Sequence, residues 1–346
     1  MTPSNPPILN TVKPPVQLRT PDWYRARLAL PQGCCQVVID TDAANEIDDQ
    51  FALAWALLSP QQLDIKGIYA APFSFAHRRA MYPNAPGDAG PFNPPATGMQ
   101  RSYDEIITVY DKLGLPSQGQ VWRGSAGYLP APQTPLHSDA AHHLVATARA
   151  CPADQPLYVL ALGCVTNVVS ALLLAPDIAD KLVVVWTSAF PSHAPHANRS
   201  FNLEQDVYAS QALYACGVPL VYLPGYHVGA QLRLSLAEAE RYVRGQGAMG
   251  DYLHGLFTHN PLWPMLGSNG EGPHSWVIWD LINIAWMLQP AWVPSELVAT
   301  PRLDDQLYWQ ADPQRPLMRE AYGVQRDAIF NDLFAKLVHH AFNTQN

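Results

Sequence analysis

Charged residues are scarce in this chain of 346 residues. They make up 14% of it, whereas hydrophobic residues make up 48%, and an average soluble domain holds roughly 25% charged residues. Lysine and arginine number 21 against 29 aspartates and glutamates, and no basic run is present that could follow a phosphate backbone. We therefore expect a packed globular protein that has no nucleic acid partner.

Cysteines are few, and long uninterrupted apolar runs are missing. The five cysteines are scattered, without a C-x-x-C pair or histidine partners at zinc spacing, so we expect reduced thiols, mostly in the core, and a cytoplasmic location. The longest apolar stretch, Leu157 to Ala175, is interrupted by Gly163 and Asn167, which predicts a strand and a helix rather than a membrane span. Without an apolar stretch typical of a signal peptide at its start, we expect a soluble protein with no membrane partner.

Proline is abundant, with 33 residues, and seven of these lie within residues 1–33. We expect an extended N-terminal arm over residues 1–33 and a single domain over residues 34–346, because no later break in composition suggests a boundary. Two polar segments are long for ordinary connections, from His77 to Arg101 and from Ser188 to Asn202. We interpret both as rims of a pocket.

Short apolar strands alternate with helical segments from residue 36 onward. The expected strands are residues 37–39, 65–70, 120–122, 157–162, 182–187, 219–223 and 296–300. The expected helices are residues 51–58, 101–113, 138–150, 166–175, 206–215, 235–244, 248–258, 275–288 and 324–343. This alternation predicts an α/β fold with an open, mainly parallel, Rossmann-like sheet and helices on both faces.

The densest group of acids directly follows the first strand. The segment D-T-D-A-A-N-E-I-D-D holds the carboxylates of Asp40, Asp42, Glu46, Asp48 and Asp49, and ligands of such sheets bind at the carboxyl ends of strands. Asp48 and Asp49 could instead begin a helix, where its dipole favours acids, but this explains only two of the five. Asp40, Asp42 and Asp49 would repel one another without a cation. Oxygen donors predict Ca²⁺ or Mg²⁺.

A further acid lies in the apolar segment from Ser275 to Leu288. Apolar residues occupy every face of the helix expected there, which predicts a helix buried all round. Asp280 would be buried with it, and an unpaired buried carboxylate costs several kcal/mol. It therefore needs a cation, an arginine or several hydrogen-bond donors. Pairing with an arginine remains the alternative to a metal.

Four segments, in this order along the chain, resemble the nucleoside hydrolase family. The acidic loop is similar to the signature D-x-D-P-G-x-D-D-A, and L-G-C-V-T-N (residues 162–167) to G-P-L-T-N. Phe201 and Asn202, with Asp206, are similar to the E-F-N-x-x-x-D-P-E-A-A segment, and Trp279-Asp280 to the C-terminal His-Asp. The correspondence covers residues 37–290. The form D-T-D-x-x-N-E-x-D-D-Q looks closer to a divergent bacterial branch.

This resemblance implies the nucleoside hydrolase fold with one Ca²⁺ at the carboxyl edge of the sheet. Its ligands would be the side chains of Asp42, Asp49 and Asp280 and the main-chain carbonyl of Thr166. The implied reaction is calcium-dependent hydrolysis of the N-glycosidic bond of ribonucleosides to free base and ribose. Asp42 would act as general base on a metal-activated water. Members of the family are usually homodimers or homotetramers, which the N-terminal arm could support.

The resemblance also implies substrate contacts. Asp48 and Asn202 would bind the ribose hydroxyls. Asn167, in the segment similar to G-P-L-T-N, would be a further substrate-binding residue. Ser200 replaces a ribose-binding glutamate of the family, which Asn198 or Glu46 could compensate. The remaining candidates are side chains that could protonate or stack on the base, namely His193, His196, Tyr226, His227, His274, Trp263, Trp276 and Trp279.

Trp279 stands in place of a family histidine that helps the base to leave, so purine specificity through that histidine is not expected. Two other functions remain open from the sequence. One is a sugar-binding protein of the same fold that keeps calcium without turnover. The other is a magnesium phosphatase of the haloacid dehalogenase type, which also places D-x-D after its first strand.

Overall fold

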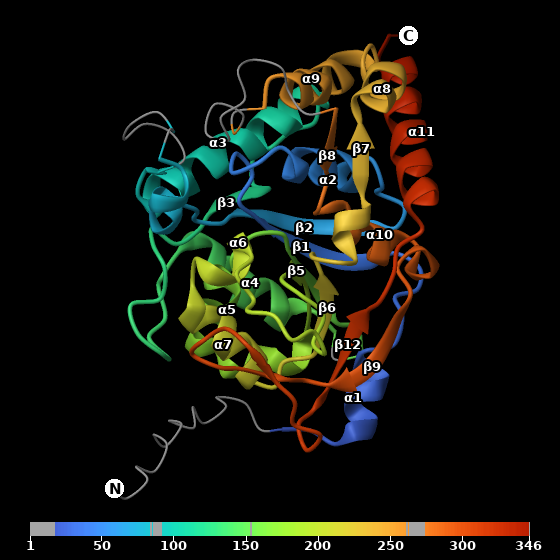
Figure 1. Cartoon of the computed structure of the whole chain (residues 1–346). Helices are drawn as coiled ribbons and strands as arrows, with labels where there is room; N and C mark the ends of the chain where they lie inside the picture. Colours follow the sequence, from blue (N-terminus) through green and yellow to red (C-terminus); the bar gives the residue numbers. More distant parts are fainter. Residues whose placement is uncertain are drawn as a thin grey trace, which may run out of the picture.

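A computed structural model of the chain describes residues 18–83, 85, 92–152, 154–260, 262 and 274–345. An eight-stranded sheet with the order β3-β2-β1-β4-β5-β6-β12-β9 runs through the molecule (Figure 1). The strands are β1 (Cys35–Thr41), β2 (Leu63–Ala70), β3 (Val121–Arg123), β4 (Leu157–Ala161), β5 (Leu182–Ser188), β6 (Leu220–Pro224), β9 (Ser295–Ala299) and β12 (Leu317–Ala321). Neighbouring strands pair in parallel, except that β9 is antiparallel to β12. The expected fold class is confirmed.

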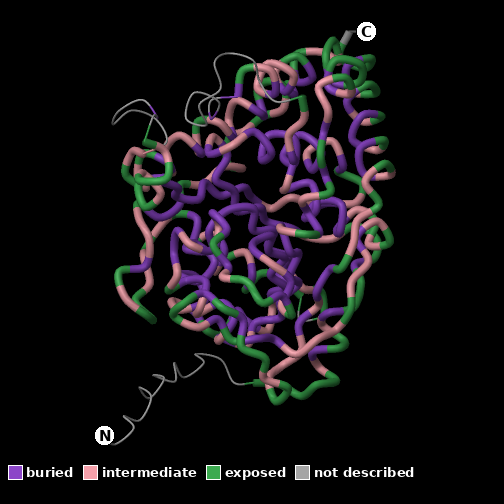
Figure 2. Tube along the Cα trace, in the orientation of Figure 1, coloured by how far each residue is buried: buried purple, intermediate pink, exposed green. Residues whose placement is uncertain are grey.

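Alternate residues of β1 face two different cores, as the two-residue period of a strand requires. Val37 and Ile39 pack in one core with helices α2 (Asp48–Leu57), α3 (Pro95–Lys112), α9 (Gly247–Thr258), α10 (Leu281–Leu288) and α11 (Arg326–Gln345). Val38 packs in the other core with α4 (Asp139–Ala150), α5 (Thr166–Leu174) and α7 (Val207–Ala215). The sheet is therefore buried on both faces, and Figure 2 shows the buried residues concentrated along it.

The N-terminal region differs from the extended arm that we expected over residues 1–33. Its described part contains helix α1 (Pro21–Arg27), which Thr20 caps through a hydrogen bond from the Trp23 amide. Tyr24 is 1% exposed, and its hydroxyl donates a 2.6 Å hydrogen bond to the Gly217 carbonyl. This segment therefore belongs to the domain, whereas residues 1–17 lie outside the described residues.

The segment expected as one helix over residues 275–288 is divided. Residues Ser275–Val277 form strand β8, which pairs with β7 (Arg233–Ser235) as a small antiparallel sheet. Helix α10 begins only at Leu281, and Asp280 occupies its N-cap position. The aromatic and β-branched residues Trp276, Val277 and Ile278 favour a strand. Asp280 consequently lies at a helix terminus instead of within a helix.

Within the described residues, no helix is both long and apolar enough to cross a membrane. All five cysteines are free, and Cys151, Cys164 and Cys216 are buried. Most of the thiols therefore lie in the core, as expected.

Candidate active site

A pocket with a volume of about 600 Å³, partly open to solvent, lies at the carboxyl edge of the sheet. Its wall follows the strand ends: Asp42 comes after β1, Leu162 after β4 and Gly225 after β6, and Ser188 ends β5. The described residues that line it are Asp42, Asn45, Glu46, Asp48, Asp49, Arg78, Leu162, Thr187, Ser188, Ser200, Phe201, Asn202, Gly225, Tyr226, Trp279 and Asp280. Its position agrees with the rule that open α/β sheets bind ligands where the strands end.

Three of the lining acids converge on one point. Asp48, Asp49 and Asp280 each offer a carboxylate oxygen, and these oxygens lie within 4.8 Å of one another. Asp48 and Asp49 begin α2, Asp280 precedes α10, and the two helices pack together. The backbone amides of both helix starts favour negative charge. The loop leading into α2 includes Ala44 with a positive φ of 101°.

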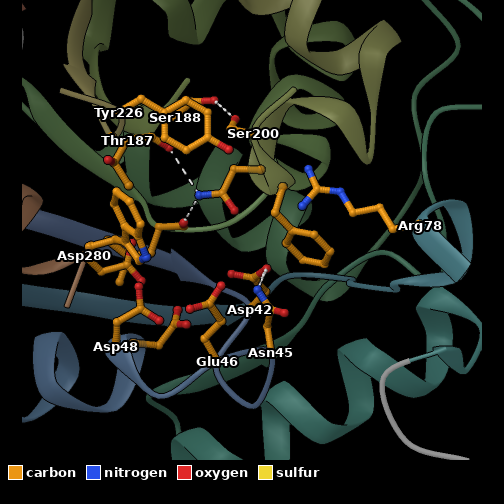
Figure 3. A pocket seen from close by; sticks show the side chains of 16 residues that line it. Asp42, Asn45, Glu46, Asp48, Arg78, Thr187, Ser188, Ser200, Tyr226 and Asp280 are labelled. Atoms are coloured by element: carbon orange, nitrogen blue, oxygen red, sulfur yellow. Dashed lines mark hydrogen bonds between the residues drawn. The ribbon is translucent and has the colours of Figure 1, made fainter. Parts of the chain in front are cut away.

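The pKa values of the acids in the pocket are raised above their usual range. Burial raises the pKa of Glu46 to about 7 and that of Asp49 to about 6. Burial raises the pKa values of Asp42, Asp48 and Asp280 well above the usual range, and neighbouring carboxylates raise them further. Figure 3 shows Glu46, Asp48 and Asp280 directed into the same space. Four buried acids and the partly buried Glu46 repel one another and need a positive partner.

A divalent cation fits this set of donors. The acids supply only oxygen, which suits Ca²⁺ or Mg²⁺, and Asp48, Asp49 and Asp280 are close enough to share one ion. Arg78 also lines the pocket, but it is paired with Glu204 at 3.1 Å. Among the described residues no arginine pairs with Asp280, and the groups that shift its pKa are all acids. The alternative of an arginine partner for Asp280 therefore finds no support there.

Four of the predicted catalytic or substrate residues line the pocket: Asp42, Glu46, Asp48 and Asn202. Asp42 accepts a 3.2 Å hydrogen bond from the Asn45 side chain. Asn202 donates hydrogen bonds to the main-chain carbonyls of Leu162 and Thr187. The three-acid group, however, contains Asp48, which we had assigned to the ribose, and does not include Asp42.

Thr166, whose main-chain carbonyl the resemblance implies as a ligand, is not among the residues that line the pocket. Its hydroxyl donates a 2.6 Å hydrogen bond to Asp206, and its residue begins helix α5. A carbonyl in the first turn of a helix points along the helix axis to accept the bond of a later residue. Leu162, which follows β4, does line the pocket, and its carbonyl accepts a hydrogen bond from Asn202.

Asn167 and Asn198 also lie outside the pocket lining, in contrast to their predicted substrate contacts. Asn167 accepts from the Ser125 amide at 2.8 Å and donates to Asp40 at 2.8 Å. Asn198 accepts from the Phe190 amide and donates to the Leu307 carbonyl. Both are fully buried, so their amides hold backbone segments together.

Asp40 likewise stays out of the pocket, although the sequence placed it beside Asp42. It is fully buried in β1, and burial raises its pKa to about 7 while the Asn167 hydrogen bond opposes this rise. Successive strand residues alternate in direction, and β1 ends at Thr41. Asp42 follows the strand and is therefore free to turn toward the pocket.

The histidines proposed as acids for the leaving base are exposed and absent from the pocket lining, namely His193, His196, His227 and His274. Tyr226 and Trp279 do line it, with ring centroids 6.1 Å apart at a near-perpendicular angle. Trp276 packs beside the cores. It lowers the pKa of Glu46, whereas burial raises it. Trp263 lies outside the described residues.

Some residues that line the pocket carried no predicted role, among them Arg78, Leu162 and Phe201. Arg78 and Phe201 come from the two polar segments that we interpreted as pocket rims, so their location carried a signal. Arg78 lies in the 3₁₀ helix Ala76–Met81, and its guanidinium carbon is 5.3 Å from the Phe201 ring centroid. Leu162 is an apolar residue at the end of a strand, so its residue type does not indicate a place in the pocket.

Solved structures of similar fold are nucleoside hydrolases and related proteins. A purine-preferring ribonucleoside hydrolase from Gardnerella vaginalis matches with a TM-score of 0.66 at 17% identity, over 88% of this chain and 99% of that one. An inosine-uridine preferring nucleoside hydrolase from Bacillus anthracis matches with a TM-score of 0.58 at 17% identity, over the same shares. The type III effector protein XopQ, complexed with adenosine diphosphate ribose, matches with a TM-score of 0.60 at 14% identity, over 93% and 99%.

No curated protein sequence matches this chain. The similarity to the solved structures is too low in identity to show more than the fold. A model of a sequence family matches over residues 37–315, a range that includes all the described residues that line the pocket. The chain belongs to the family of inosine-uridine preferring nucleoside hydrolases.

Proposed function

We propose that this protein hydrolyses the N-glycosidic bond of ribonucleosides to free base and ribose in a Ca²⁺-dependent reaction. The observation that carries the proposal is the convergence of Asp48, Asp49 and Asp280 beside Asp42 in one pocket. These acids come from two distant segments, and burial, together with their mutual repulsion, raises the pKa values of Asp48 and Asp280. Family membership supports the same chemistry.

Asp49 and Asp280 hold the cation, with Asp42 and Asp48 flanking it. Asp49 and Asp280 are common to the ligand set expected from the sequence and to the three acids that converge. The Leu162 carbonyl, just after β4, is the main-chain oxygen available on this wall. When bound, the cation supplies positive charge that makes water more acidic and orients the sugar hydroxyls.

Asp42 acts as the general base. Its raised pKa makes it a stronger base than an ordinary aspartate, and the Asn45 amide orients one of its oxygens. Asp48 and Asn202 bind the ribose hydroxyls from opposite sides. Glu46 adds a contact from the loop, since it is partly buried and lines the pocket. The side chains of Asp42, Asp48 and Asn202 thereby place the sugar over the acids.

The base departs against an aromatic wall rather than a histidine. Tyr226, Trp279 and Phe201 line the pocket, and aromatic faces bind planar bases by stacking. Among the described lining residues no histidine is available as a proton donor. We therefore assign no leaving-group acid, and the base preference stays open.

A second function is a calcium-dependent sugar-binding protein without turnover. It is favoured by Ser200 and Trp279, which stand where the resemblance implies a ribose-binding glutamate and a histidine. In the structure the Ser200 hydroxyl lies 2.8 Å from that of Ser188 and contributes no charge to the pocket. The phosphatase alternative is not retained, because the family match identifies a different class of enzyme.

The test is release of free base and reducing sugar from inosine, uridine, cytidine and adenosine, with calcium and with chelator. Asp42→Asn is expected to lower kcat/KM by about 100-fold to 10,000-fold, the usual contribution of a general base. Asp40→Asn is the matched control, because Asp40 is buried two residues away and outside the pocket.

Two results decide between the functions. Release that requires calcium and Asp42 supports hydrolysis. Binding of ribose without release of base from any nucleoside would favour the sugar-binding protein. Hydrolysis that survives both the chelator and Asp42→Asn undiminished would contradict the proposed mechanism.

A further inference from the structure

The pocket carries charge of opposite sign on its two sides. Acids fill the side formed by the β1–α2 loop and Asp280, whereas Arg78 stands on the other side (Figure 3). It is the one lysine, arginine or histidine among the described residues that line the pocket. A neutral nucleoside gives such a cation nothing to neutralise.

Arg78 is held in place by its hydrogen bonds. Its Nε and Nη2 donate to Glu204 at 3.3 and 3.1 Å, and Nη2 also donates to the Arg199 carbonyl at 2.8 Å. The Arg199 guanidinium pairs with the same carboxylate at 2.6 Å. Two arginines thus share this acid. His77, 3.8 Å from Glu204, adds little positive charge, because burial lowers its pKa.

Of these two arginines, only Arg78 lines the pocket. Its side chain is 13% exposed, whereas that of Arg199 is 67% exposed, and water screens an exposed charge far more strongly. Arg78 is also held in place, since it stacks on Phe201, which stacks in turn on Phe75 with centroids 4.2 Å apart. Within the described part of the chain, its hydrogen bonds use Nε and Nη2 and none uses Nη1.

The wall beside Arg78 is neutral and rich in hydroxyl groups. Ser188 and Ser200 line the pocket and bond to each other at 2.8 Å. Hydroxyl groups can turn to donate to an anion, and a guanidinium is suited to phosphate oxygens. A substituent of a ribose bound at the acids would reach Arg78 where it points away from Asp48 and Asp280.

We propose that Arg78, with Ser188 and Ser200, forms a subsite for a phosphoryl group attached to the ribose of the substrate. The preferred substrates are then phosphorylated nucleosides or nucleoside diphosphate sugars rather than free nucleosides. This inference rests on the proposed function for the placement of the ribose. It goes beyond that function by naming an anionic substrate class.

The test is calorimetric binding to the calcium-loaded protein. Ribose is compared with ribose 5-phosphate, which carries a phosphomonoester, and adenosine with ADP-ribose, which carries a diphosphate. A charge-assisted hydrogen bond predicts that the phosphate tightens binding by about 10-fold to 100-fold. Arg78→Gln is expected to abolish this preference. Arg244→Gln, which removes the charge of an exposed arginine outside the pocket, should retain it.

Each outcome bears on the subsite. A preference for either phosphorylated ligand that disappears in Arg78→Gln supports it, and the two ligands show whether the monoester or the diphosphate is recognised. Equal binding with and without phosphate, or equal losses for both ligands of a pair in Arg78→Gln, overturns it. If the protein hydrolyses no nucleoside yet keeps the preference, the proposed function fails and the subsite stands. Hydrolysis of nucleosides without any preference for phosphate overturns the subsite and leaves the proposed function in place.

Discussion

Two groups of buried polar residues lie at the same edge of the sheet and differ in their surroundings. The first consists of the pocket acids Glu46, Asp49 and Asp280 and their neighbours, whose pKa values rise because burial and like charges act together. The second consists of Asn167 and Asn198, whose amides find partners within the protein. Both groups lie near motifs that the resemblance singled out. The hydrogen-bond partners of a buried polar residue thus distinguish a residue of a ligand site from a residue of a structural network.

The difference predicts opposite responses to substitution. Buried like charges destabilise the folded state until a cation arrives, so removing one acid should stabilise the protein in chelator. Removing a satisfied amide strands its buried partners and should destabilise the protein with or without the cation. Substitution of an acid should therefore change both stability and calcium affinity, whereas substitution of an amide should change stability alone.

The largest effect is expected from Asp280→Asn. We expect calcium affinity to fall by about 100-fold or more, because loss of an outer-shell partner already costs about 10-fold to 100-fold. In chelator the melting temperature should rise, since four neighbouring acids lose a repulsive partner. Calorimetric calcium titration and thermal unfolding measure the two quantities.

The control for this variant is Asp111→Asn, an exposed aspartate at the end of α3. It removes the same charge and should change neither quantity appreciably. A fall in the melting temperature of Asp280→Asn in chelator would mean that Asp280 already has a favourable partner. The comparison between the two groups would then fail.

An intermediate effect is expected from pH. The pKa values of Glu46 and Asp49 are raised to about 7 and about 6 in the folded state, so the folded state binds more protons than the unfolded chain. The stability from these acids is present below about pH 4 and is lost as pH rises toward 7. Calcium replaces the protons, so its stabilising effect should grow over this range.

Thermal unfolding at about pH 5 and about pH 7.5, each with calcium and with chelator, checks this effect. The difference in melting temperature caused by calcium should be larger at the higher pH. With calcium at about 100 times its dissociation constant, the stabilisation amounts to about 2.7 kcal/mol. An equal or smaller difference at the higher pH would indicate that these carboxylates are ionised without the cation.

The sequence predicted the acidic side of the pocket better than the rest of the site. Asp42, Asp48 and Asp49 lie in one short segment after a strand, so a local pattern located them. Asp280 was found because it interrupts an apolar segment. Arg78 and the Leu162 carbonyl were missed, because one lies in an irregular region and the other is a backbone atom. Their roles depend on how distant segments meet.

The fold shows the same limit. The other strands of the large sheet and most helices followed from apolar runs, whereas β12 was missed and enters the sheet between β6 and β9. Its sequence, LMREA, lacks a clear apolar run. Its charged residues have partners in distant segments, because Arg319 donates to the Leu28 carbonyl and Glu320 accepts from the Ser192 amide. Tertiary partners that stabilise such a strand cannot be inferred from local composition.

The smallest functional effect is expected from Asn198→Ala. Its amide accepts from the Phe190 amide at 3.2 Å and donates to the Leu307 carbonyl at 2.9 Å, so the free energy of unfolding should fall by about 1–3 kcal/mol. Because Asn198 does not line the pocket, KM and calcium affinity should stay within about twofold of wild type. Denaturant unfolding and steady-state kinetics measure these quantities.

Asn202→Ala is the matched variant, since Asn202 is the asparagine of the same segment that lines the pocket. It should raise KM by about 2-fold to 10-fold, the usual effect of one hydrogen bond to substrate. A rise in KM for Asn198→Ala equal to that for Asn202→Ala would place Asn198 in contact with substrate. The assignment of Asn198 to the structural network would then be wrong, because Asn198 would belong to the pocket despite its internal partners.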